Sequence, residues 1–170
     1  LSYEDQKIRQ GGPEDFLGYE ADSLSVVYVE NSDYEKLPVT HGISDSAFLR
    51  DKVPMTKEEV RTVSLSKLRL YEDSVCYDIG AGTGSVSIEM AVRAFSGKVY
   101  AIEKKPLAVE VLKKNKAKFG VGNLEIIEGL APEAMEDLEP CTHAFIGGSS
   151  GNMKEIIRLL LKKILVCGLS

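Results

Sequence analysis

From residue 74 to the C-terminus, the spacing at which hydrophobic residues recur along the chain changes repeatedly. Short apolar runs, typical of buried strands, alternate with longer segments whose apolar residues recur every three or four positions, as in amphipathic helices. Strands are predicted at 75–79, 98–103, 123–128 and 143–147, and helices at 85–95, 106–119, 132–138 and 151–163. This alternation implies an α/β fold in which right-handed crossovers connect the strands of a mostly parallel sheet.

Another helix is predicted upstream of this region. Thr56 is followed three residues later by Glu59, which is the sequence pattern of a capping box with Thr56 as the N-cap. An apolar side of this helix would consist of Val60, Val63, Leu65 and Leu68. The helix that follows the second predicted strand has its own end signals, since Pro106 suits a first helical turn and Gly120 suits the position just after a helix.

The two ends of the chain depart from the α/β pattern. Residues 24–29, LSVVYV, have the composition of a strand and precede a polar break, but no neighbouring strand is evident in the sequence. We therefore interpret 1–31 as the tail of an upstream domain, 32–45 as a linker and 46–170 as the main domain. Residues 164–169 could open a fifth strand, so the main domain is expected to be incomplete at its C-terminus.

Composition excludes several classes of protein. The chain has 170 residues, 44% hydrophobic and 28% charged, which is ordinary for a globular protein. Its 21 basic and 26 acidic residues give a net charge of −5, so no nucleic-acid partner is predicted. No apolar run approaches the ~20 residues that span a bilayer, so no membrane partner is predicted. Three separated cysteines and two histidines predict no disulfide and no metal site, and they suit a cytoplasmic location.

The most specific local feature is the segment YDIGAGTGS, which joins the first predicted strand of the α/β region to the next helix. Gly80, Gly82 and Gly84 remove side chains from one turn, so the backbone could approach a nucleotide-like ligand. A dinucleotide-binding turn has the pattern G-x-G-x-x-G, but its last glycine would fall on Ser85. The spacing Asp78-x-Gly80-x-Gly82-x-Gly84 instead resembles the first motif of Rossmann-like, class I S-adenosylmethionine-dependent methyltransferases. The alternative is a tight structural turn without a ligand.

The ends of the next two strands offer further cofactor contacts, because ligands of doubly wound sheets bind at the carboxyl ends of strands. A carboxylate at Glu103 can accept hydrogen bonds from both ribose hydroxyls of an adenosine. The alternative is a surface glutamate beside Lys104 and Lys105. Leu130 stands where methyltransferases of this type often have Asp or Asn. The backbone of Leu130 and Ala131 could still bind the adenine edge while the leucine side chain packs on the ring.

The fourth strand leads into a second glycine-rich turn, FIGGSSG. In this fold that position borders the methionine end of the cofactor and the methyl acceptor, so Gly147, Gly148 and Ser149 are candidate substrate contacts. A turn with so few side chains leaves room for a large, flat substrate. A simple turn in which a serine caps the following helix explains these residues equally well.

Six segments narrow the resemblance to one family. They are DKVPMTKEEVR, LSKLRL, YDIGAGTGSVSIE, VYAIEK, EGLAPEAM and FIGGSSGN. Together they resemble the decarboxylating precorrin C15-methyltransferases of cobalamin biosynthesis, which occur alone or as the C-terminal half of bifunctional precorrin-6Y C5,15-methyltransferases. Residues 1–31 resemble the closing strands of the C5 half. A complete sheet of this fold has seven strands, so the resemblance implies that the far half of the sheet is absent.

The resemblance implies methyl transfer from S-adenosyl-L-methionine to the C15 meso carbon of a precorrin or cobalt-precorrin, with loss of carbon dioxide from the ring C acetate. The meso carbon is itself the nucleophile, so no catalytic side chain is assigned, and His143 is interpreted as a strand residue. The implied cofactor-binding residues are Thr56, Asp78, Gly80, Ala81, Gly82, Thr83, Gly84, Glu103, Leu130 and Ala131. A homo-oligomer is also implied.

A precorrin carries many carboxylates, so a basic surface is expected near the acceptor. Residues 50–69 contain more basic than acidic side chains. The basic ones are Arg50, Lys52, Lys57, Arg61, Lys67 and Arg69. Arg50 and Lys52, on a predicted lid segment ahead of the helix, are the preferred substrate contacts. Lys67 and Arg69 are equally well explained as a solvated helix face.

Two other functions fit the glycine motif alone. One is methylation of another small molecule or of RNA, although the acidic net charge disfavours RNA. The other is a cofactor-binding module without catalysis, which would suit the early end of the domain and the leucine at position 130.

Overall fold

The chain folds into two units. The structure, a computed structural model, describes residues 7–23, 25–30 and 40–167. The units are Leu1–Lys36 and Leu37–Ser170, and each is described by itself. The second unit contains all four strands and all four α-helices of the described residues. The assignment of 1–31 to an upstream domain, of 32–45 to a linker and of 46–170 to the main domain stays a prediction.

In the N-terminal unit, the one regular element among the described residues is the 3-10 helix η1 (Pro13–Phe16). The predicted strand at 24–29 is wrong for residues 25–29, which form no strand; Leu24 lies outside the described residues. A strand needs a neighbouring strand for its hydrogen bonds, and no described residue pairs with this segment. Its apolar side chains are exposed instead, as Val26 is to 96%.

The second unit is built on a parallel sheet of four strands. They are β1 (Val75–Ile79), β2 (Lys98–Glu103), β3 (Leu124–Glu128) and β4 (His143–Ile146). Their order is β3-β2-β1-β4, and Asp78 of β1 lies opposite Ala101 of β2 and Phe145 of β4. The predicted strands are confirmed to within one residue, and so is the parallel sheet.

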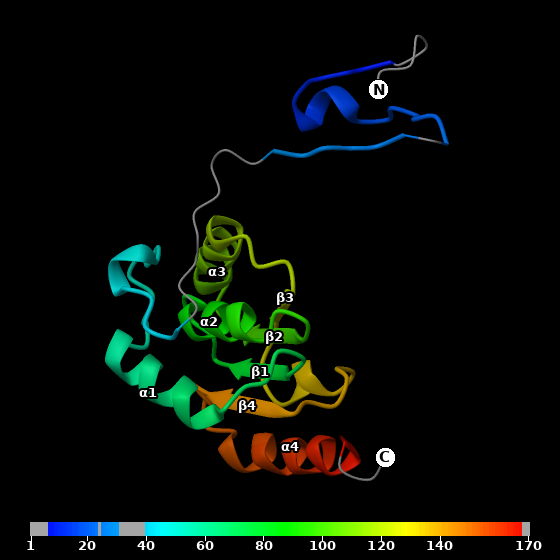
Figure 1. The fold of residues 1–170 in the computed structure, drawn as a ribbon. Coiled ribbons are helices and arrows are strands. Elements are labelled where there is room, and N and C mark those ends of the chain that lie inside the picture. Colours follow the sequence, from blue (N-terminus) through cyan, green and yellow to red (C-terminus); the bar gives the residue numbers. More distant parts are fainter. Residues whose placement is uncertain (1–6, 24, 31–39, 168–170) are drawn as a thin grey trace. The chain divides into compact units, whose positions relative to one another are not determined.

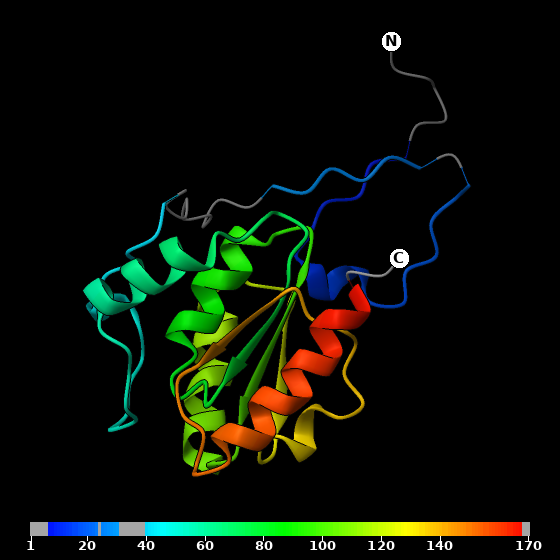
Figure 2. The same ribbon diagram turned by 90° about the horizontal axis from the view of Figure 1, so that it is seen from below.

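Helices cover both faces of the sheet. They are α1 (Glu58–Leu68), α2 (Ser85–Arg93), α3 (Pro106–Phe119) and α4 (Met153–Cys167), with the 3-10 helices η2 (Asp45–Ala47) and η3 (Glu133–Met135). Figures 1 and 2 show α2 and α3 against one face, α1 beside α2, and α4 against the opposite face.

Two predictions near these helices are wrong. The helix expected at 132–138 is only the single turn η3. Residues 164–167, expected to begin a fifth strand, form the last turn of α4, and the rest of that predicted strand lies outside the described residues. The helix continues through these residues because the segment Met153–Cys167 contains no glycine or proline that would end it earlier.

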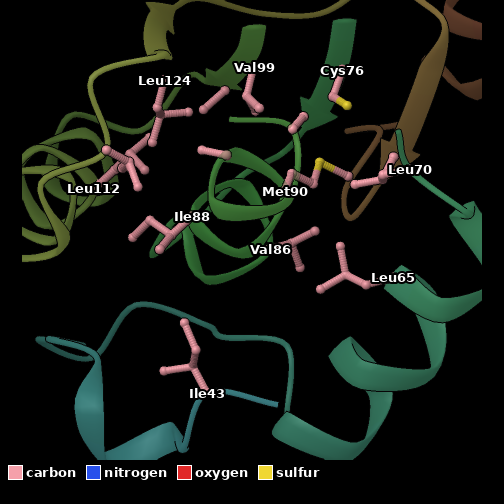
Figure 3. Packing of buried hydrophobic residues seen from close by; sticks show 14 of the residues in the cluster. Ile43, Leu65, Leu70, Cys76, Val86, Ile88, Met90, Val99, Leu112 and Leu124 are labelled. Carbon is pink, nitrogen blue, oxygen red and sulfur yellow. The ribbon is translucent and has the colours of Figure 1, made fainter. Parts of the chain in front are cut away.

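The two faces of the sheet contribute to separate hydrophobic clusters, because successive strand residues point to opposite sides. Cys76, Val99 and Leu124 pack with α2 and α3 in the larger cluster, which Figure 3 shows from close by. Tyr77 points to the other side, where it packs with Ile156 of α4. The core therefore fixes α2 and α4 on opposite faces of β1.

Helix α1 differs from its prediction in its start and in its buried side. Its N-cap is Lys57, which makes no side-chain cap bond, so the predicted capping box at Thr56 is wrong. Val60 and Val63 are 57% and 60% exposed, whereas Leu65 is fully buried. The second buried residue of this helix is charged and belongs to the site described below.

Candidate cofactor site

The two glycine-rich turns meet at the carboxyl ends of β1 and β4. The connections that leave these neighbouring strands run to opposite faces of the sheet, and ligands of doubly wound folds bind at such a switch point. The amides of Gly147 and Gly148 donate to the Ile79 carbonyl at 2.8 and 3.1 Å. A Cβ atom on Gly80 would lie 2.7 Å from the Gly148 nitrogen. The turn predicted to bind the cofactor and the turn predicted to border the acceptor are therefore in contact.

The other two glycines of the first turn also lie against protein. A Cβ atom on Gly82 would lie 2.9 Å from the Pro54 carbonyl oxygen, and one on Gly84 would lie 1.9 Å from Cδ1 of Leu112. All three glycines, Gly80 included, have a positive φ. Packing within the protein therefore requires glycine at these positions. Cofactor contacts of Gly80, Ala81, Gly82, Thr83 and Gly84 stay predictions.

Glu103 is buried at the end of β2 and reaches the first turn. One carboxylate oxygen accepts from the amide of Gly82 at 2.9 Å, and the other accepts from the amides of Lys104 and Lys105, both at 2.9 Å. The alternative of a surface glutamate is therefore wrong. A carboxylate has about four acceptor positions, so these three bonds fix its orientation and leave about one for a ligand. Its bond to ribose stays a prediction.

Two buried side-chain oxygens near the first turn have no hydrogen-bond partner among the described residues. They are Oδ1 of Asp78 and Oγ1 of Thr83. The second Asp78 oxygen accepts from the Ser87 hydroxyl. Burial raises the pKa of Asp78 to about 6, and the charge of Glu103 also raises it. The Asp78 carboxyl therefore binds its proton more tightly in the folded protein than in the unfolded chain. As the pH falls through about 6 this carboxyl takes up a proton, and the free-energy cost of burying it decreases. Buried oxygens of this kind suit a polar ligand.

A segment ahead of α1 covers part of the first turn. We call residues 42–56 the strap, and its Pro54 carbonyl lies against Gly82. Arg61 of α1 binds both ends of the strap, donating to the carbonyl of Thr56 at 2.6 Å and to the carbonyl of Ile43. The strap is therefore tied to α1 as well as to the glycine turn.

Arg61 is itself fully buried and paired with Glu89 of α2. Its Nε donates to Oε1 of Glu89 at 2.5 Å, and the Glu89 carboxylate also accepts from the strap amides of Gly42 and Ile43 at 2.9 and 3.2 Å. The prediction that Arg61 contributes to a basic surface is therefore wrong, because this guanidinium has no access to solvent.

The loop after β3 is joined to the second glycine turn by Asn152. Its side-chain nitrogen donates to the carbonyl of Ala131 at 3.0 Å, and its backbone amide donates to the Ser149 carbonyl at 2.9 Å. Ala131 is buried, whereas Leu130 is 40% exposed and available to pack on a ligand. Contacts of Leu130 and Ala131 with adenine stay predictions.

The residues predicted to contact substrate lie on the strap and the second turn. Arg50 and Lys52 are exposed in a strap turn, in which Nε of Arg50 donates to the carbonyl of Val53 at 3.2 Å. Gly147 is exposed and Ser149 is half-buried on the second turn. Substrate contacts of these residues, of Gly148, and the cofactor contact of Thr56 stay predictions.

The described residues offer no metal site and no membrane-spanning helix. These residues include no group of three or more His, Cys, Asp and Glu side chains that could hold a metal ion. None of their helices has the length and apolar character needed to cross a membrane. His143 is the first residue of β4, in agreement with its interpretation as a strand residue.

Comparison with known proteins decides the family. Residues 46–166 match the model of a family described as "Precorrin methyltransferase domain". The chain belongs to this family. The probable cobalt-precorrin-6B C(15)-methyltransferase (decarboxylating) of Sulfolobus acidocaldarius is 48% identical over 126 residues, which are 72% of this chain and 65% of the relative. The chain thus spans less than two thirds of that relative's length.

Solved structures of the family have the same fold. The precorrin-6y C5,15-methyltransferase of Geobacter metallireducens superposes with a TM-score of 0.71 at 42% identity, covering 75% of this chain and 67% of that one. The precorrin 8w decarboxylase of Methanobacterium thermoautotrophicum gives a TM-score of 0.68 at 35% identity, covering 72% and 66%. The predicted family and the Rossmann-like class I methyltransferase fold are confirmed.

The cofactor of this precorrin methyltransferase family is S-adenosyl-L-methionine, as predicted. The residues at the switch point fit it. Oδ1 of Asp78 and Oγ1 of Thr83 have no hydrogen-bond partner among the described residues, Glu103 retains acceptor capacity, and the first turn presents backbone with positive φ. The carboxylates suit the hydroxyl and ammonium donors of this molecule.

Sequence reasoning missed the residues that hold the site together. Arg61 and Glu89 fall inside the quoted segments VPMTKEEVR and VSIE, but a pairing between two helices has no local signal. Asn115 and Asn152 were likewise not identified. Asn115 lies in a lysine-rich stretch that indicates an exposed helix face, yet its side chain is fully buried.

Proposed function

We propose that this chain methylates C15 of a precorrin or cobalt-precorrin and promotes decarboxylation of the ring C acetate, which takes up a proton and becomes a methyl group as carbon dioxide leaves, in cobalamin biosynthesis. The observation that carries the proposal is the meeting of three family segments at one switch point, namely the strap and the two glycine turns. Relatives that are 48% and 46% identical to this chain over their matched residues are named for decarboxylating C15 methylation. The strap and the second turn would surround the acceptor beside the first turn.

S-adenosylmethionine, when bound, supplies an electrophilic methyl group. The residues of this chain orient and enclose the reactants. Glu103 would hold the ribose, and the first turn would take the methionine part beside Asp78. Leu130 and Ala131 would enclose the adenine. The acceptor carbon is itself the nucleophile, so no side-chain nucleophile is required. The protein would only have to align this carbon with the methyl group and exclude water.

The acceptor carries several carboxylates, and basic groups on the strap would bind them. Arg50 and Lys52 are exposed there and precede the part of the strap that contacts Gly82. The second turn, with Gly147 and Gly148 and the half-buried Ser149, would lie against the flat ring because it has few side chains. A cytoplasmic location, a homo-oligomer and the absence of a nucleic-acid partner belong to the same proposal.

A panel of methyl acceptors tests the proposed function. The 170-residue chain is incubated with S-adenosylmethionine and one of four acceptors, and release of S-adenosylhomocysteine is measured. The acceptors are a C5-methylated precorrin, its fully esterified form, a catechol and RNA. We expect turnover with the free-acid precorrin, a strong reduction with the ester because its anionic groups are masked, and none with catechol or RNA. Turnover with catechol or RNA alone would contradict the proposal, and cofactor binding without turnover would favour a non-catalytic module.

A further inference from the structure

Asn115 is a fully buried side chain that connects three elements of the site. It belongs to α3, whose inner face also carries Leu112 against Gly84 of the first turn. Its side-chain oxygen accepts from the amide of Leu49 in the strap at 2.8 Å. Its side-chain nitrogen donates to the carbonyl of Leu49 at 2.8 Å and to the carbonyl of Thr83 in the first turn at 2.9 Å. One amide group therefore joins the strap to the first glycine turn.

The hydrogen bonds of Asn115 use both of its donors. A primary amide has two N–H donors and one carbonyl oxygen, and each of these has a partner here. Leu49 is held through its N–H and its C=O, much as a neighbouring strand residue would hold it. Glutamine is the other side chain with a primary amide, but it is one methylene longer. The position therefore requires asparagine for its chemistry and not only for its volume.

The strap segment that Asn115 holds leads directly to the contact with the first turn. Leu49 precedes the 50–53 turn, in which the Val53 amide donates to the Arg50 carbonyl at 2.8 Å, and Pro54 follows against Gly82. The far ends of the strap are bound by Arg61 and Glu89. Among the described residues, Asn115 is the side chain that forms hydrogen bonds both to the middle of the strap and to the first turn. A change at this position would alter the spacing between strap and turn.

We propose that Asn115 is a positioning residue for the methyl donor, acting by holding the strap at a fixed distance from the first glycine turn. The proposal rests on the proposed function, in which that turn binds S-adenosylmethionine. It predicts that loss of the Asn115 side chain weakens cofactor binding by more than its effect on folding would explain. A merely structural asparagine would lower thermal stability and leave the affinity of the folded protein unchanged.

Asn123 provides a matched control in the same chain. It is also an asparagine with a partly buried side chain, and its nitrogen donates to two carbonyls, those of Ala91 and Ala94, at 3.0 and 2.7 Å. Those carbonyls lie at the end of α2, and neither belongs to the strap or to the first turn. Replacing Asn123 removes two similar hydrogen bonds without touching the proposed link.

The experiment compares Asn115→Ala and Asn115→Ser with Asn123→Ala in the full 170-residue chain. Thermal unfolding is measured first, and all titrations are made at a temperature at which each variant is folded. Calorimetric titration with S-adenosylhomocysteine is expected to show a roughly tenfold or larger loss of affinity for the Asn115 variants, since two or three buried hydrogen bonds are lost. Asn123→Ala is expected to be less thermally stable but to bind like the unchanged chain. Equal affinities in all variants, or an equal loss in both positions, would overturn the proposal.

Hydrogen exchange without any ligand separates this proposal from the proposed function. Amides of residues 46–55 are expected to exchange faster in the Asn115 variants than in the unchanged chain, and at the unchanged rate in Asn123→Ala. Unaltered exchange in the strap would overturn the role of Asn115 whether or not the cofactor binds. Absence of S-adenosylhomocysteine binding to the unchanged chain, with faster strap exchange in the variants, would instead contradict the proposed function.

Discussion

Replacing Arg61 with methionine will lower the free energy of unfolding by about 3 to 5 kcal/mol, because it leaves the Glu89 carboxylate buried without its cation. The two side chains are 0% and 2% exposed and only 2.5 Å apart. The substitution also removes the donors to the carbonyls of Ile43 and Thr56, so both ends of the strap lose a bond. Urea denaturation followed by circular dichroism measures the change.

Two further variants show whether the buried charge is the cause. Replacing Arg61 and Glu89 together by methionine removes the unpaired charge, so this double variant is expected to be more stable than Arg61→Met alone. Lys57→Met breaks the exposed contact with Asp45, at 3.0 Å, and is expected to change stability little. If Arg61→Met proved as stable as Lys57→Met, the ion pair could not be what holds the strap.

Replacing Gly80 with alanine will reduce the rate of methyl transfer by roughly 100-fold or more, because a displacement of about 1 Å at a catalytic site has effects of this size. The new Cβ atom would lie 2.7, 2.7 and 2.8 Å from N, O and Cα of Gly148. These are backbone atoms, so one of the two glycine turns must move. The φ of Gly80 is +76°, which adds strain. The initial rate of S-adenosylhomocysteine release measures the effect.

Gly120→Ala is the matched control for this substitution. Gly120 ends α3 with a φ of +62°, and a Cβ atom there would meet no other atom within 4 Å. The control therefore carries the backbone strain without the clash, and it is expected to lose stability while keeping its rate. Similar rates in Gly80→Ala and Gly120→Ala would show that the contact between the two glycine turns has no role in the reaction.

The layout of the α/β unit could be predicted because its signals are local. Short apolar runs marked the strands, and Pro106 and Gly120 marked the two ends of α3. Parallel pairing then followed from the alternation of strands and helices. The spacing of Gly80, Gly82 and Gly84 located the first turn, and the position of Glu103 at a strand end placed it beside that turn.

The remaining features depend on contacts between distant segments. Arg61 is buried because Glu89, 28 positions further along, supplies its counter-charge. Without that partner the sequence indicates an exposed basic residue and assigns the apolar side of α1 to Val60, Val63, Leu65 and Leu68, of which Val60 and Val63 are exposed. Asn115 is buried because the strap returns to it from 66 positions away. Residues 25–29 of the apolar run show the opposite error, since strand composition does not form a strand without a neighbouring strand.

The proposed coupling of C15 methylation to decarboxylation of one tetrapyrrole can be read from the mass of the product. A C5-methylated precorrin is incubated with the chain and with S-adenosylmethionine that carries a deuterated methyl group, and the tetrapyrrole is then analysed by mass spectrometry. We predict a product that has gained one deuterated methyl and lost one carbon dioxide. A product that has gained the methyl group and kept every carboxylate, or a tetrapyrrole that is unchanged although the cofactor binds, would contradict this coupling.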